Sequence, residues 1–309
     1  MPSLYQNILV PTDFTSIAER AVGQAFWLGE KSQGRVVLFH SLPDIRTLVH
    51  AATFNARMDL LEGEGEVFIR EVSRDSDAKL DKIIFHRGNT SAQLTRETAV
   101  GDPYVEIIRA VKKRSHDLVV VGAGNTADWR HRILGGTASR LVRKCPCSVW
   151  VVKADSPFPP KKVLVPIDYS NVSHKAMLEA AEICRAASAE LHLLHVVDSS
   201  DVVDDLLTKI PKGGEMQSEM ERFAAQKLVA IEKEFLGDLR VVRHLEWGIP
   251  WKVISNRLGE SSFDLIAMGT VGRGGVSGLL LGNTAERILT MSPCSVLTVK
   301  PDGFQSPID

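Results

Sequence analysis

The sequence predicts two doubly wound α/β domains in tandem, each built on a parallel sheet. The first observation is a repeated start: NILVPTDF at 7–14 is matched by KVLVPID at 162–168. The second is a repeated end: RKCPCSVWVVK at 143–153 is matched by TMSPCSVLTVK at 290–300. The third is the alternation of strand-like and helix-like segments between these ends, which is typical of parallel sheets. We therefore predict domains at 1–153 (copy one) and 161–301 (copy two).

The segment between the copies, ADSPFPPK at 154–161, predicts a stiff linker. Its prolines lack an amide donor and cannot continue a central strand. In copy two, five apolar segments are predicted as strands: KVLVPI, LHLLHVV, LRVVRHLEW, DLIAMG and SVLTV. Between them, helical spacing or start signals predict helices at 170–186, at 215–235, from Pro250 onward and at 283–291.

Copy one contains a conflict between local propensity and the repeat. The segment LDKIIFHRG at 80–88 is rich in β-branched residues and resembles a strand. Aligning Gly101-Asp102-Pro103 with Gly248-Ile249-Pro250 instead puts the third strand at about 92–99. We follow the repeat and predict a long helix at 67–86 with one apolar face.

Length and composition exclude several classes of protein. The 309 residues suffice for two domains with their own cores, and the 44% apolar and 24% charged fractions are those of a globular protein. A net charge of −1 gives no indication of a nucleic-acid partner. The N-terminus lacks the pattern of a signal peptide, and no apolar run approaches the roughly 18–20 residues of a membrane span. The four cysteines match neither a zinc pattern nor a disulfide framework, so we expect a reducing cytoplasm.

The best candidate site combines a glycine-rich loop with an aspartate. The loop of copy two has the pattern G-x2-G-x9-G and lies between a strand and a helix, with Gly269, Gly272 and Gly282 followed by Asn283 and Thr284. Glycines allow a ligand to approach the backbone, and a helix N-terminus favours phosphate. Asp168 follows the first strand, and this edge of a parallel sheet is where ligands bind. The structural alternative is that the glycines only form a loop and that Asn283 or Thr284 only caps the helix.

These residues carry a family resemblance. GTVGRGGVSGLLLGNTAERIL resembles the nucleotide-binding signature of the ATP-binding universal stress proteins, and VLVPIDYS and PCSVLTVKP resemble that family's first and last strands. The resemblance covers essentially the whole chain twice, as in the tandem type of the family. It implies a Rossmann-like fold, cytoplasmic location, stress-linked expression and binding of ATP or another adenine nucleotide, with any Mg²⁺ carried by the phosphates.

The same resemblance implies roles for individual residues of copy two. Asp168 would contact the adenosine side, at the ribose, and the backbone near Val196 would meet the base. The phosphates would be surrounded by Gly269, Gly272, Gly282, Asn283 and Thr284. Many members of the family have serine where this chain has Asn283, and asparagine keeps the donor capacity.

Copy one departs from the signature. Gly122 and Gly135 are in register, but Asn125 replaces the middle glycine, and Asp128 and Trp129 stand where copy two has Gly275 and Val276. A side chain in the phosphate position and a carboxylate beside a polyphosphate both disfavour binding. Arg130, His131 and Arg132 are near enough in sequence to compensate in part. We predict one strong nucleotide site per chain, in copy two.

Other candidates have two interpretations each. Cys145-Pro-Cys147 is either a redox pair or a pair of small apolar residues at a buried strand, and the single Cys294 at the matching position favours the second. His40 and His195 either line the base pocket or support the strand end. Trp247 and Trp251 either stack on a base or pack in the core. Asp201, Asp204 and Asp205 lack the pattern of a calcium loop and are expected in solvent. Arg273 either touches phosphate or is solvated.

We find no nucleophile with a base and no lysine of a GK[ST] motif, so no catalytic residue and no protein metal site is predicted. A nucleotide-sensing binding protein is therefore favoured over a slow ATPase or an adenylyl-transferring enzyme of the same fold, and a different ligand in copy one is a third possibility. We expect each sheet to have strand order 3-2-1-4-5. The apolar edge strands 149–153 and 296–300 need cover, and an intramolecular pseudo-dimer would provide it. Whether the chain also forms a homodimer is left open by the sequence.

Overall fold

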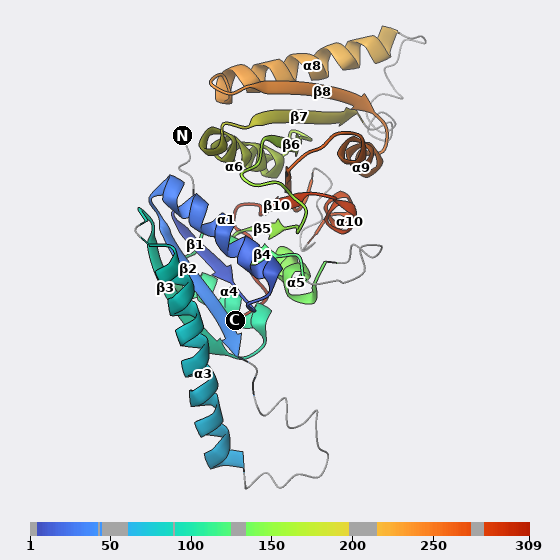
Figure 1. Ribbon diagram of the computed structural model, residues 1–309. Helices are drawn as coiled ribbons and strands as arrows, with labels where there is room; N and C mark the ends of the chain where they lie inside the picture. The colour runs from blue at the N-terminus through green and yellow to red at the C-terminus, as the bar shows by residue number, and fades with distance from the viewer. Residues whose placement is uncertain are drawn as a thin grey trace. The chain divides into compact units, whose positions relative to one another are not determined.

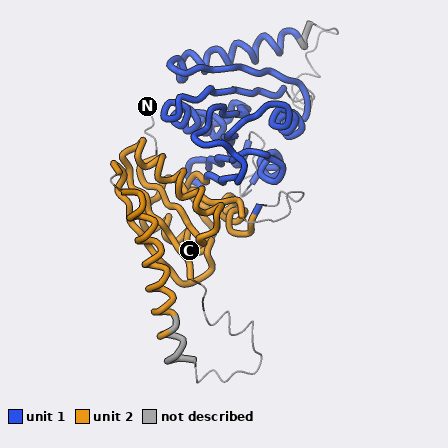
Figure 2. Tube along the Cα trace, viewed as in Figure 1, with its two compact units in different colours: residues 1–4, 126–134, 150–304 blue, residues 5–125, 135–149, 305–309 orange. Residues whose placement is uncertain are grey.

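The computed structural model describes residues 5–42, 44, 61–88, 90–124, 134–197, 215–272 and 281–309. Contacts divide the chain into two compact units (Figure 2). Unit 1 consists mainly of Trp150–Phe304, and unit 2 of Tyr5–Asn125, Gly135–Val149 and Gln305–Asp309. The boundaries of the units therefore differ slightly from those of the sequence copies. The end of the last strand of copy one belongs to unit 1, and the C-terminal residues Gln305–Asp309 belong to unit 2.

Both copies contain the predicted alternation of strands and helices (Figure 1). The elements of copy one are β1 (Asn7–Pro11), α1 (Ser16–Ser32), β2 (Arg35–Leu42), α3 (Leu61–His86), β3 (Gln93–Val100), α4 (Pro103–Arg114), β4 (Leu118–Gly122), α5 (Gly136–Lys144) and β5 (Ser148–Val152). Those of copy two are β6 (Lys162–Pro166), α6 (Asn171–Ala187), β7 (Glu190–Val197), α8 (Glu215–Phe235), β8 (Val241–Trp247), α9 (Pro250–Glu260), β9 (Leu265–Gly269), α10 (Asn283–Met291) and β10 (Ser295–Val299).

The strand order confirms the predicted topology in each copy. Copy one has the order β3-β2-β1-β4-β5 and copy two the order β8-β7-β6-β9-β10, which in both is 3-2-1-4-5. The pairings of β6 with β7 and β9, and of β1 with β2 and β4, are parallel. Because parallel crossovers are right-handed, α6 and α8 cover one face of the second sheet, and α9 and α10 cover the other. The order reverses between β6 and β9, which is where such sheets bind ligands.

The repeat predicted copy one better than local propensity did. Residues 80–86 belong to helix α3, and the third strand is Gln93–Val100. Leu80 is fully buried, whereas Phe85 is 82% exposed. Leu80 therefore lies on the face of the helix that packs on β2 and β3, whereas Phe85 lies outside that face.

The last strands of the two copies, β5 and β10, are buried at every residue. Within unit 1, the end of β5 lies next to β10 in the strand order. The backbone N–H of Lys153 donates to the Ser295 hydroxyl at 3.1 Å, and the N–H of Ser295 donates to Ser156 Oγ at 2.7 Å. The apolar edge strands are thus covered, while a pseudo-dimer of whole domains stays a prediction.

A buried and a half-buried histidine, His116 and His244, give stability a predictable pH dependence. Burial lowers the pKa of His116, which is 4% exposed, and of His244, whose Nε2 lies 2.9 Å from His192 Nδ1. A lowered histidine pKa means that the unfolded chain binds the proton more readily than the native protein does. The contribution of each neutral histidine to the free energy of unfolding is therefore fully present above about pH 6.5, the usual pKa of histidine in an unfolded chain. It is lost as the pH drops toward the lower pKa of the native protein.

We expect the free energy of unfolding to fall between about pH 7 and 5.5, with a slope of up to about 1.4 kcal/mol per pH unit for each histidine. Urea unfolding at several pH values would measure it. The variant His116→Phe removes one of the two groups, so its slope should be shallower than that of the native protein. An unchanged slope in this variant would contradict the assignment.

Candidate functional site

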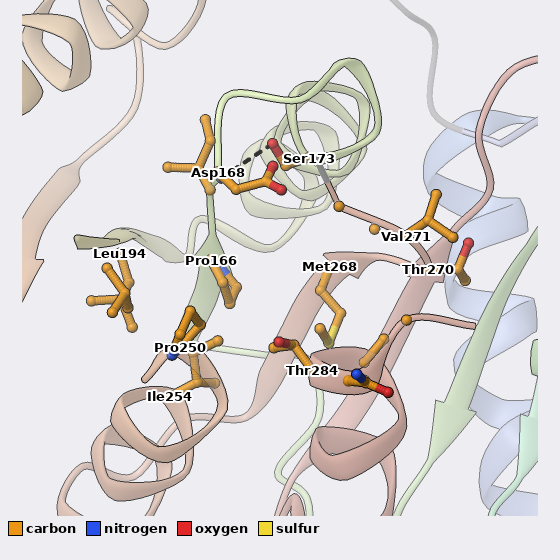
Figure 3. A pocket seen from close by; sticks show the side chains of 17 residues that line it. Pro166, Asp168, Ser173, Leu194, Pro250, Ile254, Met268, Thr270, Val271 and Thr284 are labelled. Carbon is orange, nitrogen blue, oxygen red and sulfur yellow. Dashed lines mark hydrogen bonds between the residues drawn. The ribbon is translucent and has the colours of Figure 1, made fainter. Parts of the chain in front are cut away.

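A cavity of about 460 Å³ opens at the carboxyl ends of the strands in copy two (Figure 3). All seven residues that the sequence predicted for nucleotide binding line it: Asp168, Val196, Gly269, Gly272, Gly282, Asn283 and Thr284. They come from the ends of β6, β7 and β9 and from the start of α10. The sheet thus gathers at one place residues that are more than 100 positions apart in the chain.

Asp168 is held by the turn that it starts. Its Oδ1 accepts hydrogen bonds from the Ser170 backbone N–H at 3.0 Å and from the Ser170 hydroxyl at 2.6 Å. Ser170 in turn caps α6, because its Oγ accepts from the Ser173 N–H at 3.2 Å. Tyr169 between them has a φ of 63°, a left-handed conformation that is costly for an aromatic residue. The turn therefore presents the carboxylate of Asp168 in one fixed orientation.

Gly272 lies directly opposite this carboxylate. A Cβ atom placed on Gly272 would be only 2.7 Å from Asp168 Oδ2, closer than real Cβ contacts. A Cβ on Gly269 would meet Val172 Cγ1 at the same distance. Neither Gly269, Gly272 nor Gly282 has a positive φ. Gly269 and Gly272 are thus required for close packing in the loop and not for a special backbone conformation, whereas a Cβ on Gly282 would meet Thr270 O at an ordinary 3.5 Å.

The start of α10 forms the opposite wall. Gly282 is the N-cap residue, and no side chain caps this helix. The Gly282 N–H donates to Thr270 O at 2.8 Å, so the loop is closed by its own backbone. The structural alternative, in which Asn283 or Thr284 caps the helix, is therefore not what the structure shows. The first-turn N–H groups, with the positive end of the helix dipole, border the cavity and favour an anion.

The remaining wall is apolar. Its side chains come from strand ends and from the first turn of α9, as Figure 3 shows for Pro166, Leu194, Pro250, Ile254 and Met268. Such a surface suits the flat apolar face of a heterocyclic base. The sequence prediction missed these residues, together with Ser173, although the Pro250 helix start and the repeat place them at the same edge of the sheet. Among the described residues that line the cavity, Asp168 alone has an ionisable side chain.

Copy one keeps part of this arrangement. A cavity of about 290 Å³ is lined by Asp13, Thr15, Gly122, Gly135 and Thr137, among others. Asp13 Oδ1 accepts from the Thr15 N–H at 3.1 Å and from its hydroxyl at 2.5 Å, as Asp168 does from Ser170. The loop itself differs, because it requires a glycine with a φ of 97° at Gly124, where copy two has a valine. The residues that the sequence singled out in this loop, Asn125, Asp128, Trp129, Arg130, His131 and Arg132, lie outside the described residues.

The matched histidines have a structural role at the end of the second strand. His195 Nδ1 lies 2.8 Å from Ile167 O, and its ring contacts Tyr169 with centroids 4.4 Å apart. His40 makes the same bond to Thr12 O at 2.8 Å, and it also lines the cavity of copy one. His195 is not among the described residues that line the larger cavity. Each histidine thus holds the backbone just before the aspartate.

The two tryptophans lie apart from the cavity lining. Trp247 Nε1 donates to Glu221 Oε1 at 2.7 Å, and the Trp251 ring is covered by the Arg287 guanidinium at 4.3 Å. Neither belongs to the described residues that line the cavity, so base stacking by them has no support. Arg273, Asp201, Asp204 and Asp205 lie outside the described residues. Within the described ranges, no group of three or more potential metal ligands is found, and no helix is long and apolar enough to cross a membrane.

Comparison with known proteins decides the family. The model of the Universal stress protein family matches residues 4–153 and again residues 159–300. The chain belongs to the universal stress protein family. Its two matches make it a tandem member. It is similar to Universal stress protein E of Salmonella typhi, with 26% identity over an alignment of 331 positions that covers 99% of this chain and 98% of that protein. A shorter relative, Universal stress protein MJ0531 of Methanocaldococcus jannaschii, is 34% identical over an alignment of 144 positions that covers 45% of this chain and 82% of that protein.

Two solved structures share the fold. A universal stress protein from Archaeoglobus fulgidus superposes with a TM-score of 0.61 and 21% identity, covering 95% of this chain and 97% of its own. A protein from Pseudomonas aeruginosa PAO1 gives a TM-score of 0.66 with 19% identity, covering 97% and 94%. At this level of identity the likeness concerns the fold. The ligand of this universal stress protein has to be argued from its own cavity.

Proposed function

We propose that copy two of this tandem universal stress protein binds ATP or another adenine nucleotide, and that binding serves a regulatory role in a cytoplasmic stress response. The observation that carries the proposal is the single cavity lined by all seven residues predicted from the sequence. Its apolar end fits a base, its aspartate fits ribose hydroxyls, and its helix N-terminus fits phosphate.

Binding without rapid turnover is the form of the function that the residues support. Hydrolysis or group transfer needs a group that moves a proton or activates a nucleophile. Asp168 is the one ionisable side chain among the described lining residues, and one of its oxygens is engaged by Ser170. This arrangement suits orientation of a hydroxyl donor more than proton transfer. Any Mg²⁺ would be held by phosphate oxygens and water.

The test is to identify and then titrate the ligand. The protein should release an adenine nucleotide on denaturation, which mass spectrometry would identify. Calorimetry on ligand-free protein should give one strong site per chain for ATP with Mg²⁺, weaker binding of GTP, and no heat from Mg²⁺ alone. ADP, AMP and cyclic AMP in the same assay would define the phosphate requirement. Absence of binding to every adenine nucleotide, or equal affinity for GTP, would refute the proposal.

A further inference from the structure

The four cysteines of the chain differ sharply in their surroundings. Cys184 and Cys294 are buried, and burial raises the pKa of their thiols to about 12 and about 11. The thiolate is the reactive form, so these two are inert at neutral pH. Cys145 is also fully buried, whereas Cys147 is partly exposed. Cys147 is therefore the most exposed of the four cysteines and the one best placed to meet a soluble reagent in the folded protein.

Cys147 has a second thiol within reach. Its Sγ lies 3.5 Å from the Sγ of Cys145, across Pro146. Cys145 is the C-cap residue of α5, and its backbone N–H donates to Leu141 O at 2.8 Å, so the helix end fixes its position. Arg143 and Lys144 occupy the last turn of the same helix.

Copy two shows the same geometry with one atom changed. Ser292 is the C-cap of α10 and occupies the position of Cys145, and its Oγ lies 3.5 Å from Cys294 Sγ. Ser292 has backbone angles of −58° and 129°, close to the −67° and 136° of Cys145. A serine therefore adopts the same C-cap conformation at this helix end as Cys145 does. The cysteine pair of copy one adds a chemical property that the packing does not need.

We propose that Cys145 and Cys147 form a redox-active dithiol that low-molecular-weight disulfides, such as oxidised glutathione, convert to a disulfide. The Cys147 thiolate attacks one sulfur of glutathione disulfide, and one glutathione leaves as its thiol. Cys145 Sγ, which lies 3.5 Å away and needs no access from solvent, then attacks Cys147 Sγ and expels the second glutathione, which takes up the Cys145 proton. Two thiol hydrogens of the protein end on two glutathione thiols, and two electrons pass to the original disulfide.

The short spacing sets the character of this site. A ring closed over a single intervening residue departs from relaxed disulfide geometry, and a strained disulfide is more easily reduced again. The pair is therefore suited to reversible oxidation and not to permanent stapling. The proposal is independent of nucleotide binding, because both cysteines lie at the end of α5 opposite its first turn, which borders the smaller cavity.

The experiment measures thiols and mass on the intact chain. After incubation with oxidised glutathione, the protein should lose two of its four titratable thiols, lose two hydrogens in mass and remain unlinked to other chains. Peptide mapping should join Cys145 to Cys147. In Cys145→Ser, which copies the natural residue of copy two, the reaction should stop with one glutathione on Cys147. Dithiothreitol should reverse both products.

Two further variants make the outcome decisive. Cys147→Ser should leave the remaining thiols unmodified, because the attacking sulfur is gone. Ser292→Cys builds the same pair in copy two, but Cys294 is only 3% exposed, so this second pair should stay reduced under the same conditions. Circular dichroism before treatment checks that each variant is folded. The proposal is overturned if glutathione stays on Cys147 of the native protein, if Cys147 does not react, or if intermolecular disulfides form instead.

Discussion

Replacing Gly272 with valine should weaken ATP binding by roughly 30-fold or more, with little loss of stability. The new side chain would start 2.7 Å from Asp168 Oδ2, and Asp168 cannot simply turn away because Ser170 holds its other oxygen. Either the loop moves away from the phosphates or the carboxylate loses its orientation. Each polar contact left unmade costs on the order of 1–3 kcal/mol, and about 1.4 kcal/mol is tenfold in affinity.

The matched change in copy one is Asn125→Val, at the position that aligns with Gly272. Because copy one is predicted not to hold the phosphates strongly, this variant should keep the native affinity and a stoichiometry of one in calorimetry. Thermal unfolding of both variants checks that the loss is specific to binding. An equal loss from the two changes, or two sites of matched affinity in the native protein, would show that copy one is competent and that the asymmetry argument is wrong.

Replacing Asp168 with asparagine should weaken adenine nucleotide binding by roughly 10- to 150-fold. Asparagine keeps the shape and one oxygen for the Ser170 contacts. It replaces the second oxygen, which would accept hydrogen bonds from ribose hydroxyls, with an NH₂ donor, and it removes the negative charge. Hydrogen bonds to a charged group are worth about 1.5–3 kcal/mol, more than neutral ones. The loss should be smaller for a nucleotide that lacks the ribose 2′-hydroxyl, since that ligand never made the full set of contacts.

Asp13→Asn is the natural control for this variant. Asp13 sits in the same turn of copy one, with the same bonds to the residue two positions on and the same left-handed aromatic residue, Phe14, between them. The two substitutions should therefore perturb their turns equally, and only the one in copy two should change affinity in calorimetry. Unchanged binding in Asp168→Asn would remove this carboxylate from the proposed site.

The repeat was the most informative feature of the sequence. It predicted the strand order in each copy and the helical state of residues 80–86 against their β-branched composition, because two copies of one fold must place equivalent segments alike. Helices Glu215–Phe235 and Asn283–Met291 were predicted with the bounds that the structure has, since apolar spacing and start signals are local properties. The glycine pattern and Asp168 were likewise readable as one edge of a parallel sheet.

Distances between segments far apart in the chain were decided only by the tertiary structure. The approach of Gly272 to Asp168 depends on the register of β9 against β6 and on the left-handed turn at Tyr169, neither of which is encoded in a short motif. The same holds for the roles of the glycines, which serve close packing and not a special φ. The 3.5 Å distance between the Sγ atoms of Cys145 and Cys147 could not be predicted from the sequence either, because spacing along the chain does not fix the directions of the two side chains at a helix end. The sequence by itself determined the fold and the family, and it predicted the place of the candidate site, since these follow from periodicity, repetition and motifs. The structure decided which atoms meet in the cavity, since that follows from packing between elements.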